Sequence, residues 1–264
     1  MEINCLHIAD IFAQSGLDMV TETLPKLIKE RDIHFVVANG ENTLEGKGIT
    51  EGQCQHLFNL GVHVITSGNH IWDRKKTFYA ENPLIQKYLL RPLNYPVGIE
   101  GRGSTVYELK NGLKIGVINL QGRTYMYDID CPFRVGEREI EKLQDETNII
   151  IVDFHAEATA EKIAFRHYVD GRVSAVIGTH THVQTADEMI TSSGTAYITD
   201  AGMTGPHDGV IGMQKEPTVK KFILQTYFKF EPSKGDVRFH GLFFKVNAET
   251  GRATYVERVR IDKS

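Results

Sequence analysis

The sequence lacks several features that would direct its function elsewhere. Its 264 residues contain only three cysteines, Cys5, Cys54 and Cys131, which are widely spaced and include no C-x-x-C pair. This excludes a disulfide framework or a zinc ribbon and is typical of reduced thiols in the cytoplasm. No apolar run approaches the roughly eighteen residues of a membrane helix, and the N-terminus has no signal-peptide pattern. We therefore expect a cytoplasmic protein without a membrane partner.

A surplus of positive charge is also lacking. The formal net charge is −4 at pH 7, from 30 Lys and Arg against 34 Asp and Glu. Without a global basic field the chain is not expected to bind duplex DNA, although a nucleotide can bind locally. The chain also has no linker, internal repeat or low-complexity tract, so residues 1–264 are expected to form a single domain.

Strand-like and helix-like segments alternate over the first two thirds of the chain. Apolar, β-branched runs predict strands at residues 3–8, 33–38, 62–66, 115–120, 149–154, 173–177 and 196–199. Helical spacing lies between them, and Pro25 is expected to kink or restart the first helix. Thr50 and Gln53 predict a capping box that opens a helix over residues 51–60. The alternation indicates a layered α/β fold.

The last sixty residues have a different pattern. Residues 222–230, 237–246 and 253–261 predict successive strands, with a turn at 249–251. They are expected to be antiparallel additions that complete a second sheet. Residues 82–103 are rich in Pro and Gly and predict a long connection that borders the site.

Polar groups follow the predicted strands at their carboxyl ends, the edge where ligand sites of open α/β sheets lie. They are Asp10, Glu41 with Asn42, Asn69 with His70, His155, and His180 with His182. Each alone has an ordinary alternative, such as a helix cap for an Asp or a hydrogen-bonded loop residue for a His. Together they indicate a metal centre. Imidazoles combined with carboxylates and amide oxygens favour Fe, Mn or Zn over Mg or Ca.

Two metal ions side by side would suit this donor set. A pair about 3.5–4 Å apart needs a bridging carboxylate and further ligands on each side. Such a pair lowers the pKa of a bridging water towards neutrality and clamps a phosphoryl group for in-line attack.

Five blocks of the sequence resemble those of the calcineurin-like metallophosphoesterases. They contain Asp10, residues 40–42, residues 68–70, His155 and residues 178–182. Longer runs are similar to the bacterial YmdB-type branch, namely residues 38–42, 68–73, 120–123, 153–159, 178–187 and 202–206. The resemblance implies a four-layer αββα sandwich with a dinuclear metal site at the carboxyl ends of its strands.

The resemblance also implies a role for each candidate residue. It places one divalent ion on Asp10, Asn42 and His182, and a second on Asn69, His155 and His180, with Glu41 bridging the two. Fe or Mn is the expected metal and Zn is an alternative. His70 is expected to stay off the metals and to protonate the leaving oxygen. Many relatives have a His where this chain has Phe12, and Asn42 is expected to supply the missing ligand.

Residues that contact substrate have weaker signals. The run from Gly40 to Gly48 departs from an ATP phosphate loop, because its Gly-Lys pair comes one residue late and Gly48 replaces the hydroxyl that would hold Mg²⁺. Lys47 and Gly48 either line the substrate pocket or belong to an ordinary loop. Arg123 either binds phosphate or is a surface residue.

Further polar residues lie near the candidate ligands. Asp153, Glu157 and Asp187 either accept hydrogen bonds from ligand histidines or are solvated carboxylates. The remaining histidines, among them His7, are taken as structural.

The predicted function is that of a phosphodiesterase that uses a metal-bridged hydroxide and His70 as general acid. The first loop has Gln14 and Leu17 where relatives often have basic residues, which favours a singly charged diester over a monoester dianion. The resemblance points to 2′,3′-cyclic nucleotides as substrate and phosphoric ester hydrolysis as the reaction. A phosphomonoesterase or nucleotidase on the same site, and a metal-binding regulatory protein of low turnover, are the alternatives. A homo-oligomer is expected.

Overall fold

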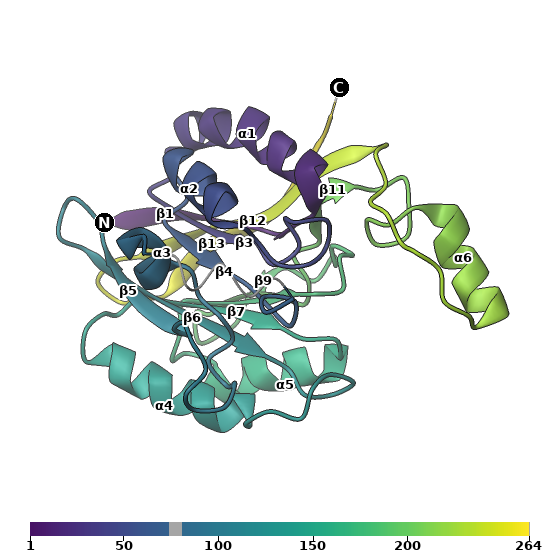
Figure 1. Ribbon diagram of the computed structural model, residues 1–264. Helices are drawn as coiled ribbons and strands as arrows, with labels where there is room; N and C mark the ends of the chain where they lie inside the picture. The colour runs from purple at the N-terminus through teal and green to yellow at the C-terminus, as the bar shows by residue number, and fades with distance from the viewer. Residues whose placement is uncertain (74–80, 264) are drawn as a thin grey trace.

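The computed structural model describes residues 1–73 and 81–263, whose strands form two sheets (Figure 1). The seven-stranded sheet has the order β2 (Asp10–Ile11), β11 (Met203–Pro206), β12 (Val237–Asn247), β1 (Glu2–Ile8), β3 (Phe35–Asn39) and β4 (Val64–Thr66), and β13 (Ala253–Asp262) pairs with β12. The six-stranded sheet has the order β5 (Ser104–Glu108), β6 (Lys114–Gln121), β7 (Ile150–His155), β8 (Ala175–Thr179), β10 (Ala196–Ile198) and β9 (Met189–Ile190). The predicted mixed α/β class is confirmed.

Helices lie outside the two sheets (Figure 1). They are α1 (Ala13–Glu30), α2 (Glu51–Asn59), α3 (Pro83–Tyr88), α4 (Pro132–Gln144), α5 (Thr159–Val169) and α6 (Lys215–Leu224). Helices α1 and α2 cover the seven-stranded sheet, whereas α4 and α5 cover the six-stranded sheet. None of the helices in the described part of the chain has the length and apolarity that a bilayer crossing requires.

The core is divided among the faces of the sheets because successive side chains of a strand point in opposite directions. Cys5 of β1 faces the space between the sheets, where it shares an apolar cluster with Ile151 of β7. Its neighbour Leu6 faces the other way and packs in a cluster with Leu24 of α1. The inner strands are thus buried on both faces, which explains their continuous apolar runs.

Parallel pairing brings the carboxyl ends of the central strands to one edge. Strands β1, β3 and β4 run parallel to each other in one sheet, as do β6, β7 and β8 in the other. Glu41 and Asn69 follow β3 and β4, His155 ends β7, and His180 follows β8. The fold therefore gathers polar side chains from both sheets at a common edge.

The last third of the chain differs from the prediction in two ways. Strands β12 and β13 are antiparallel as expected, but β12 pairs with β1 and so belongs to the sheet of the N-terminal strands. The strand predicted at residues 222–230 is wrong, because residues 215–224 form α6. Val219, Phe222 and Ile223 have the i, i+3, i+4 spacing of a helix, and this periodicity prevails over the β propensity of the apolar run.

Three local predictions can also be compared with the structure. The capping box of Thr50 and Gln53 is present and opens α2 at Glu51, so this prediction is confirmed. Helix α1 continues through Pro25 and does not restart there. The segment 82–103 contains the short helix α3, and its Tyr95 packs against Trp72, with ring centroids 4.5 Å apart.

Candidate metal centre

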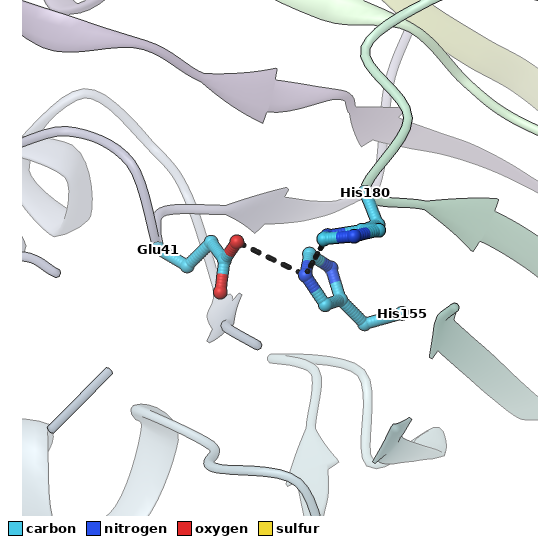
Figure 2. Close-up of side chains that lie close together, drawn as sticks. All are labelled: Glu41, His155 and His180. Carbon is cyan, nitrogen blue, oxygen red and sulfur yellow. Dashed lines mark hydrogen bonds and ion pairs between the residues drawn. The ribbon is translucent and has the colours of Figure 1, made fainter. Parts of the chain in front are cut away.

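Three donor atoms converge on the Nε2 atom of His155, and we call these four groups the His155 cluster. Glu41 Oε1 lies 3.0 Å from that nitrogen, His180 Nδ1 lies 3.0 Å away, and Asn69 Oδ1 lies 3.2 Å away. Figure 2 shows the Glu41 carboxylate and the His180 ring directed at the His155 ring. Glu41 and His155 are fully buried. The cluster thus brings two loops of the seven-stranded sheet against the end of β7 and the loop after β8.

A chain of buried hydrogen bonds fixes the orientation of the His155 ring. The Thr179 hydroxyl donates to Asp153 Oδ1 at 2.7 Å, so it can only accept at its 2.9 Å contact with His155 Nδ1. His155 Nδ1 therefore carries a proton, and Nε2 is the ring nitrogen that faces the cluster and is left to bind a metal ion. The other carboxylate oxygen, Asp153 Oδ2, contacts His7 Nε2 at 3.1 Å, so His7 extends this series of hydrogen bonds away from the cluster. Outer partners of this kind orient metal-binding histidines.

The second group of donors surrounds the side-chain amide of Asn42, and we call it the Asn42 cluster. The Nδ2 atom of Asn42 lies 3.2 Å from Glu41 Oε1, 3.2 Å from His182 Nε2 and 3.4 Å from Asp10 Oδ1. An amide nitrogen has two hydrogens and cannot donate to three acceptors. Rotation of the amide by half a turn would instead present Oδ1, an oxygen donor, to a cation at this point. Glu41 belongs to both clusters.

The loop that carries the two histidines is held in an unusual backbone conformation. His180 has φ +100° and His182 has φ +66°, in the left-handed region that costs free energy for residues with a Cβ atom. A buried ion pair holds this loop: Lys162 Nζ donates to Asp200 Oδ2 and to the Thr179 carbonyl, both at 2.8 Å. The Thr181 amide donates to the same Asp200 oxygen at 3.0 Å. These contacts of Lys162 and Asp200 thus hold the loop in its strained backbone conformation.

The spacing of the donors fits a divalent transition metal. Two ligands that bind one ion at about 2.1 Å and at right angles lie about 3.0 Å apart. The contacts of the His155 cluster have this length, and its donors are two nitrogens and two oxygens. Gly68 keeps the space open, since a Cβ atom there would lie 2.2 Å from both Glu41 Oε2 and His155 Nε2. Both the donor set and the cradle therefore suit Fe, Mn or Zn.

Charges within the clusters also favour a cation. Burial would raise the pKa of Glu41, but the charge and hydrogen bond of His155 lower it to about 2. Burial would lower the pKa of His155, but Glu41 and Asp10 raise it to about 9, so the pair keeps a proton that a metal ion can replace. Burial lowers the pKa of His182, and burial with repulsion from His155 lowers that of His180 to about 3. Both rings are therefore neutral and can donate lone pairs.

His70 lies at the rim of this site and belongs to neither cluster. Its backbone amide donates to Glu41 Oε2 at 3.1 Å, which ties the turn to the shared carboxylate. Its Nδ1 contacts Asp73 Oδ2 at 2.9 Å, so the ring is oriented and Nε2 is its other polar atom. The side chain is 38% exposed and lines the pocket at the clusters. The expectation that His70 stays off the metals remains a prediction.

The three predicted substrate contacts lie in different surroundings. Lys47 is exposed and lines a neighbouring groove, next to Gly46 of the cluster pocket. Gly48 is buried, and its carbonyl accepts from the Leu44 amide within the turn. Arg123 is exposed and its backbone amide donates to Glu161 at 3.0 Å. The structure thus brings only Lys47 to a surface that is continuous with the site.

The structure decides between the alternatives for Glu157 and Asp187 and shows a supporting lysine that was not predicted. Glu157 contacts His180 Nε2 at 3.1 Å, in line with one of its two alternatives. Asp187 instead bonds Thr185 and Thr199, which are not candidate ligands. Lys162 was missed, although the spacing of Lys162, Phe165 and Val169 marks the buried face of α5. An amphipathic pattern with Lys among its apolar positions is the signal that could have found it.

Comparisons with known proteins agree with this geometry. The family described as YmdB-like protein matches residues 6–259. The 2′,3′-cyclic-nucleotide 2′-phosphodiesterase of Bacillus subtilis is 44% identical over 257 residues, which cover 97% of this chain and 96% of that protein. The crystal structure of a novel phosphatase from Mycoplasma pneumoniae matches with a TM-score of 0.92 at 36% identity, covering 99% of this chain and 94% of that one.

A further solved structure has the same fold along its whole length. It is a hypothetical protein of Thermus thermophilus, matched with a TM-score of 0.90 at 36% identity over 99% of this chain and 100% of that one. The predicted resemblance is confirmed by a family match that spans nearly the entire chain. The chain belongs to the YmdB-like protein family and is a phosphoric ester hydrolase.

Proposed function

We propose that the chain is a phosphodiesterase that opens 2′,3′-cyclic nucleotides at two divalent metal ions, Fe or Mn. The observation that carries this proposal is the lining of the pocket at the clusters. It consists of Phe12, Glu41, Asn42, Gly46, His70, His180, His182, Ile211 and Met213. Among the described residues, this lining includes neither lysine nor arginine. A monoester dianion would need such extra positive charge, whereas a diester carries a single negative charge.

The two clusters provide the binding sites for the metals within the four-layer arrangement of the family. Asn69, His155 and His180 would hold one ion, and Asp10, Asn42 and His182 would hold the other. Glu41 would bridge them, because it contributes to both clusters. When bound, the two ions would activate a water molecule and neutralise charge on the phosphoryl oxygens.

His70 would supply the proton for the leaving group. In the reaction a bond forms between the water oxygen and phosphorus, and one bond between phosphorus and a ribose oxygen breaks. His70 Nε2 would donate its proton to that ribose oxygen, so that the product is a nucleoside monophosphate. The contact of Nδ1 with Asp73 would keep the ring oriented, with Nε2 directed at the pocket.

A pocket beside the His155 cluster would take the base of the nucleotide. It has a volume of about 320 Å³ and is lined by Asn69, Tyr125, Met126, Tyr127 and His180. Tyr125 is 89% exposed, so its ring face is free to stack on a base. The B. subtilis relative is named for activity on 2′,3′-cyclic nucleotides, which supports the same substrate for this chain.

A comparison of a cyclic diester with its own product tests the proposal. The protein, purified without chelator and loaded with Fe(II) or Mn(II), should convert 2′,3′-cyclic AMP to adenosine monophosphate and release no inorganic phosphate. Faster release of phosphate from the monoester than ring opening would favour the nucleotidase alternative. Two tightly bound metals without turnover of either ester would favour the regulatory alternative.

A further inference from the structure

A second, larger groove lies next to the pocket at the clusters. Its volume is about 750 Å³, compared with about 130 Å³ at the clusters themselves. It runs between the start of α1 and the segment that follows α6, which projects from the body of the molecule (Figure 1). The small pocket has room for a phosphate and its ring, so an extended substrate would have to continue elsewhere.

The groove is continuous with the cluster pocket. Met213 lines both, and the neighbours Gly46 and Lys47 line one each, as do Phe12 and Ala13. On its other side the cluster pocket shares His180 with the tyrosine-lined pocket. The clusters therefore lie between a pocket suited to one base and a longer groove.

The chemistry of the groove is that of a surface for single-stranded nucleic acid. Its lining contains four lysines, Lys47, Lys221, Lys229 and Lys234, against two glutamates, Glu45 and Glu231. Among the described residues, Lys229 pairs with Glu231 at 2.9 Å, whereas Lys47, Lys221 and Lys234 have no carboxylate within ion-pair distance. These unpaired ammonium groups are free to contact phosphates.

Aromatic rings alternate with these lysines along the same segment. Tyr227, Phe228 and Phe230 line the groove, and Tyr227 is 89% exposed. Lys221 Nζ lies 5.0 Å from the centre of the Phe230 ring, so cation and ring share one wall. Lysines that follow a backbone and rings on which bases stack are the two elements of single-strand binding sites.

We propose that this groove binds the upstream nucleotides of a single-stranded RNA whose 3′ end is a 2′,3′-cyclic phosphate. The inference rests on the proposed function and extends it from mononucleotides to RNA ends. The terminal base would enter the tyrosine-lined pocket and its cyclic phosphate would lie at the clusters. The upstream RNA, which is joined to the 5′ oxygen of the terminal ribose, would follow the groove. Its phosphates would contact Lys221 and Lys234, and one of its bases would stack on Tyr227.

Turnover of substrates of different length tests the groove. The metal-loaded enzyme should open the cyclic end of a hexaadenylate with a kcat/KM at least about fivefold above that for 2′,3′-cyclic AMP, the effect expected from one stacked base. The double variant Lys221→Gln/Lys234→Gln should reduce this ratio. The matched double variant Lys110→Gln/Lys114→Gln removes the same charge from two exposed lysines, one in the turn after β5 and one at the start of β6, and should keep the ratio.

Binding of a product oligonucleotide gives a readout that does not depend on catalysis. A 5′-fluorescein hexaadenylate with a 3′-phosphate should bind the metal-loaded wild type, and fluorescence anisotropy should give a log Kd that depends linearly on log salt. Loss of two phosphate contacts should change that slope by about 1.4 and weaken binding roughly 25-fold at 0.1 M salt. Tyr227→Ala should weaken binding at least about fivefold, whereas Tyr227→Phe should restore it.

The outcomes separate the groove from the proposed function. Hexaadenylate binding that depends on the groove lysines supports the groove even if no ester is hydrolysed, and then the proposed function alone fails. Equal kcat/KM for the monomer and the hexamer, with no oligonucleotide binding, overturns the groove and leaves the proposed function intact. Self-association that fills the groove with a second copy, detected by sedimentation and unaffected by the oligonucleotide, would also overturn it.

Discussion

The His155 cluster and the Asn42 cluster share Glu41 but differ in how their other donors are arranged. Around His155 the donor atoms lie 3.0 to 3.2 Å from one nitrogen, and the ring is fixed from behind by Thr179. Around Asn42 the amide nitrogen occupies the centre, and His182 Nε2 lies 3.8 Å from Asp10 Oδ1. The donors of the His155 cluster already have the spacing of metal ligands. In the Asn42 cluster, the side-chain amide of Asn42 must first rotate to present its oxygen.

For the two proposed metal sites, the difference predicts unequal affinity. A preorganised donor set has a small reorganisation cost when it binds, and a set that must rearrange binds more weakly. We therefore expect stepwise loading, with the first ion in the His155 cluster. The variants below are ordered from the largest expected effect to the smallest.

Glu41→Gln removes the one residue that the two clusters share. The neutral amide no longer compensates two cations, so both sites should lose more than the ~100-fold in affinity that supporting residues cost. Elemental analysis after dialysis should find less than one metal per chain, and turnover should fall with it. Glu108→Gln, an exposed glutamate of β5, is the matched control. Two tightly bound metals in Glu41→Gln would contradict its bridging role.

His70→Asn leaves both clusters intact and should remove the proposed general acid. Turnover should fall roughly 10²–10⁴-fold while the metal content stays at the wild-type value. The loss should be smaller for a nitrophenyl diester, whose leaving group needs little protonation. Equal losses on the nitrophenyl and nucleoside esters would count against His70 as the acid.

A matched pair of amide variants sharpens the comparison between the clusters. Asn42→Ala should reduce the bound metal from two ions towards one, because the weaker cluster loses its central side chain. Asn69→Ala removes an amide from the His155 cluster, where Glu41, His155 and His180 remain in contact. The total bound metal should therefore stay closer to two ions in Asn69→Ala than in Asn42→Ala. Isothermal titration of metal into both proteins measures the difference. Equal loss in both would mean that the clusters do not differ.

Thr179→Val should lower the metal affinity of the His155 cluster alone, and by less than the ligand variants above. The variant removes the hydroxyl that accepts from His155 Nδ1, so the affinity of the first ion should fall about 10- to 100-fold. Thr179→Ser keeps the hydroxyl and should behave as the wild type. A change in the second, weaker binding step without a change in the first would contradict the assignment of Thr179 to the His155 cluster.

The candidate ligands could be predicted from sequence because of a simple geometric rule. The carboxyl ends of parallel strands share one edge, so Glu41 after β3 and Asn69 after β4 had to lie close together. The same rule applies in the other sheet, where His155 ends β7 and His180 follows the parallel strand β8. What the rule could not provide was the register between the sheets, and so the unequal spacing of the two clusters could not be predicted.

Other features depended on contacts between distant residues. The partner of Lys162 is Asp200, 38 residues away, and only the docking of α5 against the end of β10 brings them together. The position of β12 beside β1 joins segments more than 230 residues apart, and local sequence carries no information about it. The secondary structure of α6, by contrast, depends on neighbouring residues, but there the helical spacing of the apolar residues and their strand propensity gave opposite predictions.

The arrangement of donors from two sheets has a consequence for how the protein unfolds. Glu41 and Asn69 are attached to the seven-stranded sheet and His155 and His180 to the other, so a bound ion would clamp one sheet to the other. Separation of the sheets would then require release of that ion. At a free metal concentration 100 times its Kd, this linkage adds about 2.7 kcal/mol to the free energy of unfolding. The melting temperature should therefore rise with metal concentration, which makes thermal stability itself a gauge of site occupancy.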